Sequence, residues 1–203
     1  MKLTLFLIIA LSALLLLATA KKINPYFNKT KSHHTKFGFR NPYLKSDIEK
    51  KKLRDLFKMM NSDRPNPSYQ ISNKINIDEL NQKIINGQNF ITWIGHSTML
   101  LNLYGKLILT DPIFSERCSP IQFIGPKRYT SPSIGIESLP EIDIVVISHN
   151  HYDHLDKNTV KILKNDTSTV WYVPLGLKPL LVKLGIQNVI ELDWFKEHNN
   201  SEF

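Results

Sequence analysis

The sequence of 203 residues contains a single cysteine, Cys118. One thiol excludes a framework of intrachain disulfides and any zinc site that needs several thiolate ligands. Internal repeats and low-complexity blocks are also absent from the sequence. Hydrophobic residues make up 42% of the chain and charged residues 22%, and both values are ordinary for a globular protein. The composition therefore argues against wholesale disorder, while the redox compartment stays open.

The first twenty residues carry one lysine, Lys2, followed by an unbroken run of apolar and small residues. Such a segment is a targeting signal and is excluded from the fold. Ala18-Thr19-Ala20 matches the small-x-small cleavage pattern of a signal peptide, yet the stretch from Leu3 to Ala20 approaches the length that spans a bilayer. We expect residues 1–20 to be either a signal peptide or a membrane anchor, so the protein is expected to be membrane-associated or exported.

Residues 21–87 comprise a polar and aromatic arm, which includes His33 and His34, and a predicted amphipathic helix. A capping box of Ser46 and Glu49 opens this helix. Apolar residues then recur at helical spacing, at Leu53, Leu56, Phe57 and Met60. The net charge of +8 and the basic residues between positions 45 and 58 favour anionic partners, with a solvated helix face as the simpler interpretation.

From about residue 88 the sequence changes to short apolar segments that are typical of β-strands. These segments cover residues 89–95, 98–105, 106–112, 142–148, 169–174 and 188–192. Tyr104-Gly105-Lys106 predicts a hairpin turn, and Asp156 is placed to cap a short helix that extends to Leu163. Residues 175–185 predict another helix, which ends at its glycine. Strands that alternate with helices indicate an α/β layered sheet.

The sequence ISHNHYDHLD, residues 147–156, brings three histidines and an aspartate together directly after an apolar run. That run is rich in β-branched residues, so the histidines begin where a buried strand leaves its sheet. His149 and His151 alternate along the loop and can face one metal ion, whereas Asp153 and His154 continue into a turn and can face a second. Imidazole nitrogen and carboxylate oxygen are ligands that zinc accepts. The alternative is a histidine-rich surface loop without a metal.

The spacing His-x-His-x-Asp-His resembles the signature of the metallo-β-lactamase fold. Longer stretches are similar to the zinc-dependent N-acylphosphatidylethanolamine phospholipase D family, and the similarity runs from about residue 88 to Phe195. These stretches are WIGHSTMLLNLYGKLILTDPIFSERCSPIQFIGPKRY, LPEIDIVVISHNHYDHLD and WYVPLGLKPLLVKLGIQNVIELDWF. The resemblance implies that residues 88–203 form the N-terminal half of a metallo-β-lactamase αββα sandwich.

The resemblance also implies a role for each residue of the motif. His149 and His151 would be ligands of one zinc ion. Asp153 and His154 would be ligands of the other zinc ion and would act in catalysis. Asp111, at the end of its own predicted strand, would hold a ligand histidine by accepting the proton of its second ring nitrogen. A cap on a turn is the alternative role for this aspartate.

Substrate contacts are implied for residues on either side of the predicted metal site. Tyr152 lies between the ligands, where the resemblance implies contact with the substrate phosphate or head group. Gln122 and Phe123 are predicted to bind substrate, because with Lys127 and Arg128 they form an aromatic and basic mixture that suits the lip of a lipid cavity. Loop packing accounts for the same composition equally well.

The activity implied by the resemblance is hydrolysis of N-acylphosphatidylethanolamine to N-acylethanolamine and phosphatidic acid. Two zinc ions would activate a shared water for in-line attack on phosphorus. The expected partners are a phospholipid substrate and a membrane surface. No nucleic acid is expected, since the basic stretch does not interleave aromatics as a strand-binding groove would. The oligomeric state stays open.

The similar family supplies its remaining zinc ligands from a region that follows the ELDWF sequence. We do not assign His198 to that role, and His96 is either close to the site or a satisfied core histidine. We therefore expect a truncated chain with a half-built site that hydrolyses little by itself. The alternatives are another hydrolase of the same fold, acting on a different phosphodiester or on a lactone, and a non-catalytic chain that binds metal or lipid.

Overall fold

The computed structural model describes residues 23–44 and 74–199, which lie in two separate compact units. In the first unit, strand β1 (His34–Thr35) pairs antiparallel with β2 (Gly38–Phe39). The second unit contains a sheet of six strands with helices, and it carries the whole histidine motif. The predicted leader at 1–20 and the predicted helix after Ser46 lie outside the described residues. Among the residues that are described, no helix is long and apolar enough to cross a bilayer.

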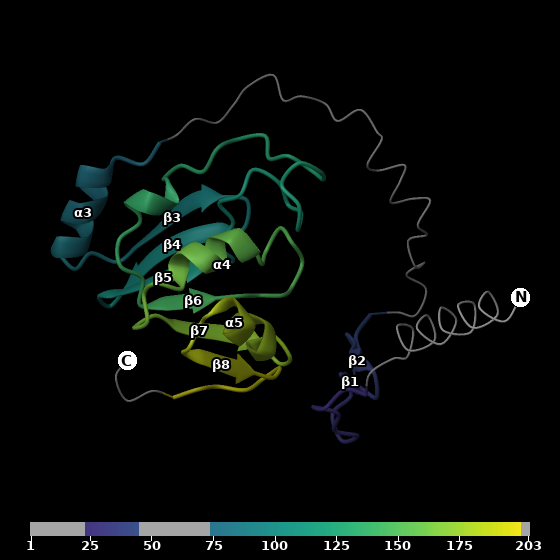
Figure 1. Cartoon of the computed structure of the whole chain (residues 1–203). Helices are drawn as coiled ribbons and strands as arrows, with labels where there is room; N and C mark the ends of the chain where they lie inside the picture. The colour runs from purple at the N-terminus through teal and green to yellow at the C-terminus, as the bar shows by residue number, and fades with distance from the viewer. Residues whose placement is uncertain (1–22, 45–73, 200–203) are drawn as a thin grey trace, which may run out of the picture. The chain divides into compact units, whose positions relative to one another are not determined.

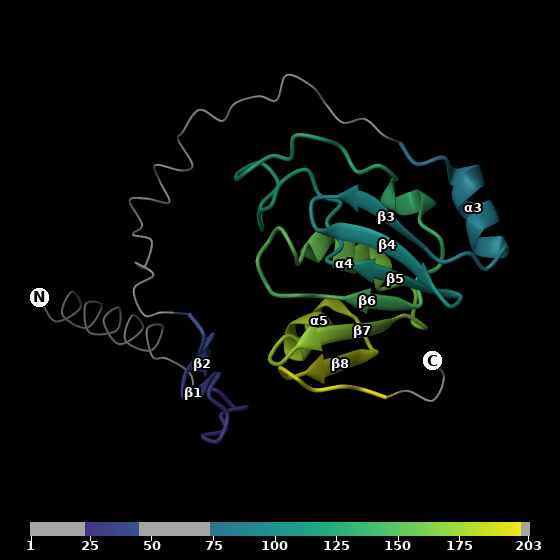
Figure 2. The same cartoon turned by 180° about the vertical axis from the view of Figure 1, so that it is seen from behind.

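The sheet of the second unit has its strands in the same order as the sequence (Figures 1 and 2). The first three strands are antiparallel neighbours, and the last four run parallel to one another. The strands are β3 (Phe90–Gly95), β4 (Thr98–Leu103), β5 (Lys106–Thr110), β6 (Ile144–Val146), β7 (Val170–Pro174) and β8 (Val189–Leu192). Each lies within a segment predicted from the apolar pattern, so the prediction of an α/β sheet is confirmed.

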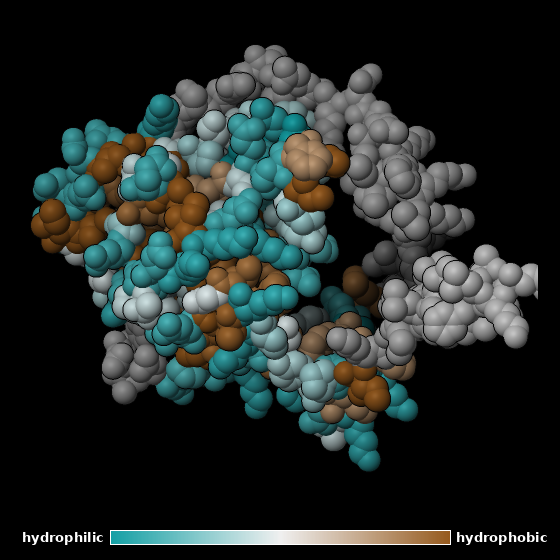
Figure 3. Space-filling view, viewed as in Figure 1, coloured by the Kyte–Doolittle hydropathy of each residue, from teal (hydrophilic) through white to brown (hydrophobic). Residues whose placement is uncertain are grey.

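The helices of this unit are α3 (Ile77–Ile85), α4 (Lys157–Leu163) and α5 (Lys178–Leu184), with a short 3-10 helix η1 (Ile136–Ser138). α4 and α5 lie on one face of the sheet, in front of it in Figure 1 and behind it in Figure 2. Figure 3 shows this face with mostly hydrophilic side chains and with apolar side chains gathered near α3. One sheet with helices on one face corresponds to half of the predicted sandwich.

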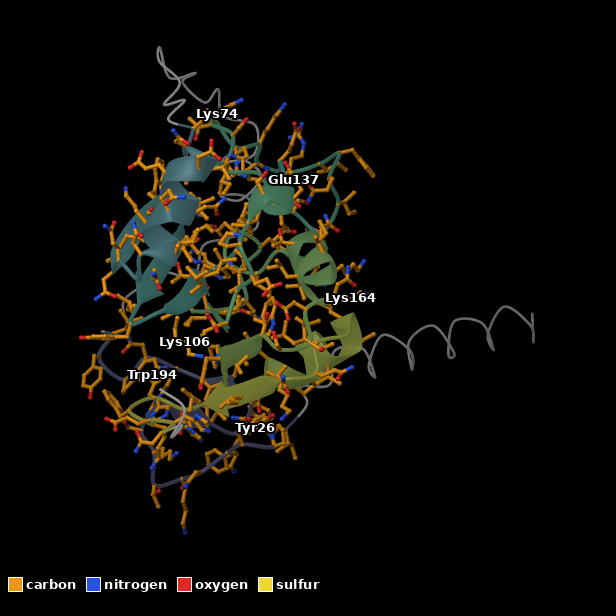
Figure 4. The ribbon with its side chains drawn as sticks, turned by 90° about the vertical axis from the view of Figure 1, so that its left-hand side faces the viewer. Tyr26, Lys74, Lys106, Glu137, Lys164 and Trp194 are labelled. Atoms are coloured by element: carbon orange, nitrogen blue, oxygen red, sulfur yellow. The ribbon has the colours of Figure 1, made fainter. Side chains whose placement is uncertain are left out.

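The core forms where the sheet meets α4 and α5, and side chains fill the space between the two layers (Figure 4). In β4 and β5 every second side chain is buried, because successive side chains of a strand point to opposite faces. The fully buried apolar side chains include Leu100, Leu109, Val145, Val160, Trp171 and Leu181. Burial of a side chain of this size contributes about 1.5–3 kcal/mol, so this layer fixes the register of the strands.

Local signals in the sequence explain where most of these elements begin and end. Asp156 caps α4 by accepting a hydrogen bond from Asn158 N, as predicted. Gly185 ends α5 in a left-handed conformation with φ 104°, which glycine adopts without steric cost. The turn between β4 and β5 has positive φ at Tyr104 and Gly105, as a tight hairpin requires. Helix α3 was not predicted, although its Asn76 cap, which accepts from two backbone amides, is a recognisable signal.

Candidate metal centre

The candidate centre lies at the sheet edge where β3, β5 and β6 end. Asp111 directly follows β5, and Ser148 and His149 follow β6. Because β5 and β6 are parallel, their carboxyl ends meet at the same edge, which is where α/β sheets place their ligands. β3 runs in the same direction as β5, since both are antiparallel to β4, so the turn that carries His96 reaches this edge as well.

Asp111 is the anchor of the centre and is only 7% exposed. Its carboxylate accepts hydrogen bonds from Ser148 N at 2.7 Å and Ser148 Oγ at 2.7 Å, and it lies 2.8 Å from His154 Nδ1. The backbone of Asp111 has φ 36°, and its carbonyl accepts from Thr98 Oγ1 at 2.8 Å. A buried carboxylate with this many donors holds the two loops after β5 and β6 together.

The ring of His154 is oriented by this carboxylate. The nitrogen Nδ1 carries the proton when it donates to Asp111 Oδ2, and the second nitrogen Nε2 then has a free lone pair. His154 Nε2 lies 3.7 Å from Asp153 Oδ2, so the lone pair points toward a second ligand of the motif. A carboxylate can fix a metal-binding histidine through such a contact. Asp111 thus contacts a histidine of the motif, and its role behind a metal ligand stays a prediction.

The other two histidines of the motif lie beside His154. The ring centroids of His149 and His154 are 4.0 Å apart, and those of His149 and His151 are 4.6 Å apart. His149 Nδ1 is 2.9 Å from Ser148 Oγ, so its Nε2 also remains available as a ligand atom. Burial and the nearby charges of His154 and His151 lower the pKa of His149, which favours the neutral imidazole that binds metal.

Asp153 faces His96 across the edge of the sheet. His96 Nε2 is 3.2 Å from Asp153 Oδ2, and Ser97 Oγ donates to the backbone carbonyl of Asp153 at 3.2 Å. Burial raises the pKa of the Asp153 carboxyl, but its own backbone amide, the hydrogen bond with His96 and the charge of His154 outweigh burial and lower the pKa. The carboxylate is therefore ionised at neutral pH, as a metal ligand must be.

The loop between Ser148 and α4 is held in a compact turn. The amides of His154 and Leu155 both donate to the carbonyl of His151, at 3.0 and 2.8 Å. Asp156 then accepts from Ser115 N at 2.9 Å and Thr159 Oγ1 at 2.7 Å, which ties the start of α4 to the segment that follows β5. The four ligand-type side chains of the motif are thus gathered rather than splayed, and imidazole and carboxylate donors fit zinc or a similar divalent ion.

A cleft with a volume of about 360 Å³ opens beside the centre. His96 and Asp153 line it together with Lys127, Arg128 and Glu116, and Lys127 Nζ lies 3.4 Å from Glu116 Oε2. Burial lowers the pKa of Arg128, and Asp156 opposes that effect. Gly95 has φ 152°, and a Cβ there would lie 3.3 Å from a terminal nitrogen of Arg128, so the glycine permits the close approach of the guanidinium to the strand.

The predicted substrate-binding residues lie around this cleft rather than within its lining. Tyr152 is exposed, with Lys157 Nζ 5.8 Å from the centre of its ring. The side-chain amide of Gln122 donates to the carbonyls of Arg117 and Ser119, so it supports its own loop. Phe123 is 78% exposed. Their contact with substrate stays a prediction.

Two residues of the centre were not assigned to it from the sequence. Ser148 joins Asp111, His149 and His154 through one hydroxyl, and a serine before the motif gives no signal of that role. His96 was left open between a core residue and a site residue, and the structure places its ring at Asp153. The interactions that position both side chains are long-range, and only the folded sheet brings them together.

The described fold and centre define an α/β domain with a metal-type His/Asp cluster at its sheet edge. A family model for the beta-lactamase superfamily domain matches residues 90–193. The match covers half of the chain, so the chain belongs to the beta-lactamase superfamily.

Curated relatives share the same region. The chain is 45% identical over 111 residues to an N-acyl-phosphatidylethanolamine-hydrolyzing phospholipase D of Caenorhabditis elegans, covering 52% of this chain and 31% of the relative. It is 39% identical to a mitochondrial protein of the same name from Saccharomyces cerevisiae, covering 52% and 22%. A solved structure from Veillonella parvula, titled a possible metal-dependent hydrolase, is 20% identical with a TM-score of 0.46, covering 55% and 44%. The chain spans less than a third of the length of both curated relatives.

Proposed function

We propose that this chain carries half of the two-metal centre of a zinc-dependent phosphodiesterase that hydrolyses N-acylphosphatidylethanolamine. The observation that carries the proposal is the gathering of His149, His151, Asp153 and His154 behind the Asp111 anchor. The identity of 45% to a relative named for this hydrolysis lies in the same region of the sequence. Because the chain spans only part of that relative, the reaction and the substrate remain proposals for this protein.

The residues of the chain would contribute binding and orientation. His149 and His151 would hold one zinc ion, and Asp153 and His154 would hold the other. Asp111 keeps the Nδ1 proton of His154 in place, so that Nε2 stays a ligand atom. When bound, the zinc ions supply activation of water and neutralisation of phosphate charge. Arg128 in the cleft would attract the anionic phosphodiester toward the centre, and the charge of Lys127 is offset by its pair with Glu116.

A membrane surface is the proposed location of the substrate. Apolar side chains are exposed on the loop beside the cleft, at Ile121, Phe123 and Ile124. Basic residues flank them, and the chain has a net charge of +8, which favours anionic lipid surfaces. The apolar leader predicted at residues 1–20 supports the same proposal for a membrane-associated or exported protein.

Release of N-acylethanolamine from vesicles that contain N-acylphosphatidylethanolamine tests the proposal. We expect slow, zinc-dependent hydrolysis that is lost in Asp153→Asn and retained in the matched histidine control His198→Ala, whose ring lies beside Tyr172. Faster turnover of a lactone or a nucleic acid would contradict the proposal. A vesicle-binding assay with the double variant Phe123→Ser and Ile124→Ser tests the membrane contact separately, and we expect weaker binding.

A non-catalytic chain that binds metal and lipid is the second candidate. It uses the same His/Asp cluster and the exposed apolar side chains Ile121, Phe123 and Ile124, and it requires no reaction. Zinc-dependent vesicle binding without hydrolysis of any phosphodiester would support this candidate over the enzyme.

A further inference from the structure

We propose that His96 is the third protein ligand of a zinc site that it forms with Asp153 and His154. The assignment extends the metal centre of the proposed function, and it does not depend on the substrate. It differs from the roles inferred from the motif, because His96 lies 57 residues before Asp153 and outside the motif.

The first support is the convergence of three ligand atoms. One ligand atom each from His96, Asp153 and His154 lies within 4.8 Å of the others. His96 Nε2 is 3.2 Å from Asp153 Oδ2, and the same oxygen is 3.7 Å from His154 Nε2. Ligands placed about 2.0–2.2 Å from a tetrahedral zinc ion are about 3.4 Å from one another. The observed distances are therefore close to those of a formed site.

The second support is that the fold fixes the ring of His154 and the backbone positions of His96 and Asp153. The lone pair of His154 Nε2 is fixed by the bond of its other nitrogen to Asp111. The turn that carries His96 has φ 51° at this residue, and Trp93 Nε1 donates to the His96 carbonyl at 2.9 Å. Ser97 Oγ donates to the carbonyl of Asp153, so this turn is joined directly to the motif. His96 and Asp153 are thus positioned by one connected set of hydrogen bonds.

The third support is the direction in which the site opens. His96 and Asp153 both line the cleft of about 360 Å³, whereas Asp111, which contacts His154 Nδ1, is not one of its lining residues. Three protein ligands with the fourth position facing a cleft is the usual form of a catalytic zinc site. In this arrangement the described residues supply all three protein ligands of one zinc ion, while His149 and His151 offer only two ligands to a second ion.

An exposed ion pair between His96 and Asp153 is the competing explanation of their contact. Such a pair adds little stability and needs no metal. It would leave zinc affinity independent of the imidazole ring at position 96, provided that another side chain donates the same hydrogen bond to Asp153.

The experiment measures zinc per chain by elemental analysis and zinc affinity by competition with a chromophoric chelator, using the full chain. The variants are His96→Ala, His96→Gln, His151→Ala and the control His198→Ala. Glutamine donates a hydrogen bond but is a poor zinc ligand, so His96→Gln separates a ligand from a positioning residue. Thermal unfolding of the metal-free variants shows whether each one is folded, and the intensity of cobalt absorption bands reports the number of ligands.

We expect one tightly bound zinc in the wild-type chain, in His198→Ala and in His151→Ala, and a loss of more than 100-fold in affinity in both His96 variants. This loss of zinc affinity exceeds the roughly 10–100-fold loss that is typical of removing a residue that only supports a ligand. Wild-type affinity in His96→Gln would overturn the inference. If His151→Ala loses the tight zinc and both His96 variants keep it, the inference about His96 is wrong and the motif-based centre of the proposed function is supported. Absence of zinc from the wild-type chain would overturn both.

Discussion

The substitution Asp111→Asn tests the support behind the metal ligands. Asparagine has the same shape as aspartate and tolerates the positive φ of this position, so the backbone is expected to stay in place. Its carbonyl oxygen can still accept from Ser148 N, and its amide can donate to Ser148 Oγ. The bond to His154 is different, because an amide NH₂ cannot accept the proton of Nδ1.

His154 is therefore expected to change tautomer in this variant. With Nδ1 as the acceptor, the proton moves to Nε2 and occupies the lone pair that faces Asp153. A zinc ion must displace that proton, and loss of a supporting carboxylate of this kind typically lowers metal affinity by roughly 10–100-fold. This range corresponds to about 1.4–2.7 kcal/mol of binding free energy.

Zinc competition at constant pH is the direct assay, with nitrogen NMR of the His154 ring to identify the tautomer. The matched control is Asp143→Asn, which makes the same change of charge at the opposite end of β6, where the carboxylate accepts from Leu107 N at 2.7 Å. We expect the control to bind zinc like the wild type. If Asp111→Asn binds zinc within about 3-fold of the wild type, the carboxylate does not set the tautomer and the reasoning is wrong.

Three further predictions concern pH and stability. Burial and the charges of His154 and His151 lower the pKa of His149 below its usual 6.5, so we expect an NMR titration midpoint below that value in the metal-free chain. As pH falls, His149 of the unfolded chain takes up a proton before His149 of the folded chain does. His149 therefore lowers the free energy of unfolding as pH falls through 6.5 toward the folded pKa. A titration midpoint above 6.5 would contradict this prediction. Asp156→Ala removes the cap of α4 and leaves Ser115 N and Thr159 Oγ1 without their acceptor, which should lower the free energy of unfolding in urea by about 1–3 kcal/mol. Leu181→Ala leaves a cavity between α5 and the sheet and should cost about 2–5 kcal/mol in the same assay, whereas a cost below about 1 kcal/mol would place Leu181 outside the core.

The strands could be predicted from the sequence because their signal is local. Apolar runs such as residues 142–148 and turn residues such as Gly105 report the strand and its end within a few positions. The caps at Asp156 and Gly185 were predictable for the same reason. Helix α3 was missed although its apolar residues Ile77, Leu80 and Ile84 recur at helical spacing, so its signal was as local as that of the strands.

The same difference between local and long-range signals applies to the candidate centre. The ligand-type residues of the motif are adjacent in sequence, so their chemistry was visible without a structure. The contacts of Ser148 with Asp111 and of His96 with Asp153 span 37 and 57 residues, and no local pattern encodes them. They exist because β3, β5 and β6 end at one edge of the sheet.

Hydrogen bonds within the protein organise the candidate centre. The side chains that orient the motif, Asp111, Ser148 and Ser97, all belong to the same sheet edge as the ligands. Their hydrogen bonds fix the ring of His154 and the backbone of Asp153 through the protein alone. Metal binding then has little ordering entropy to overcome, since ordering a free loop would cost roughly 1–2 kcal/mol for each residue fixed. The strength of zinc binding to this chain should therefore follow the number of ligands at the edge, and His96 is the residue that decides that number.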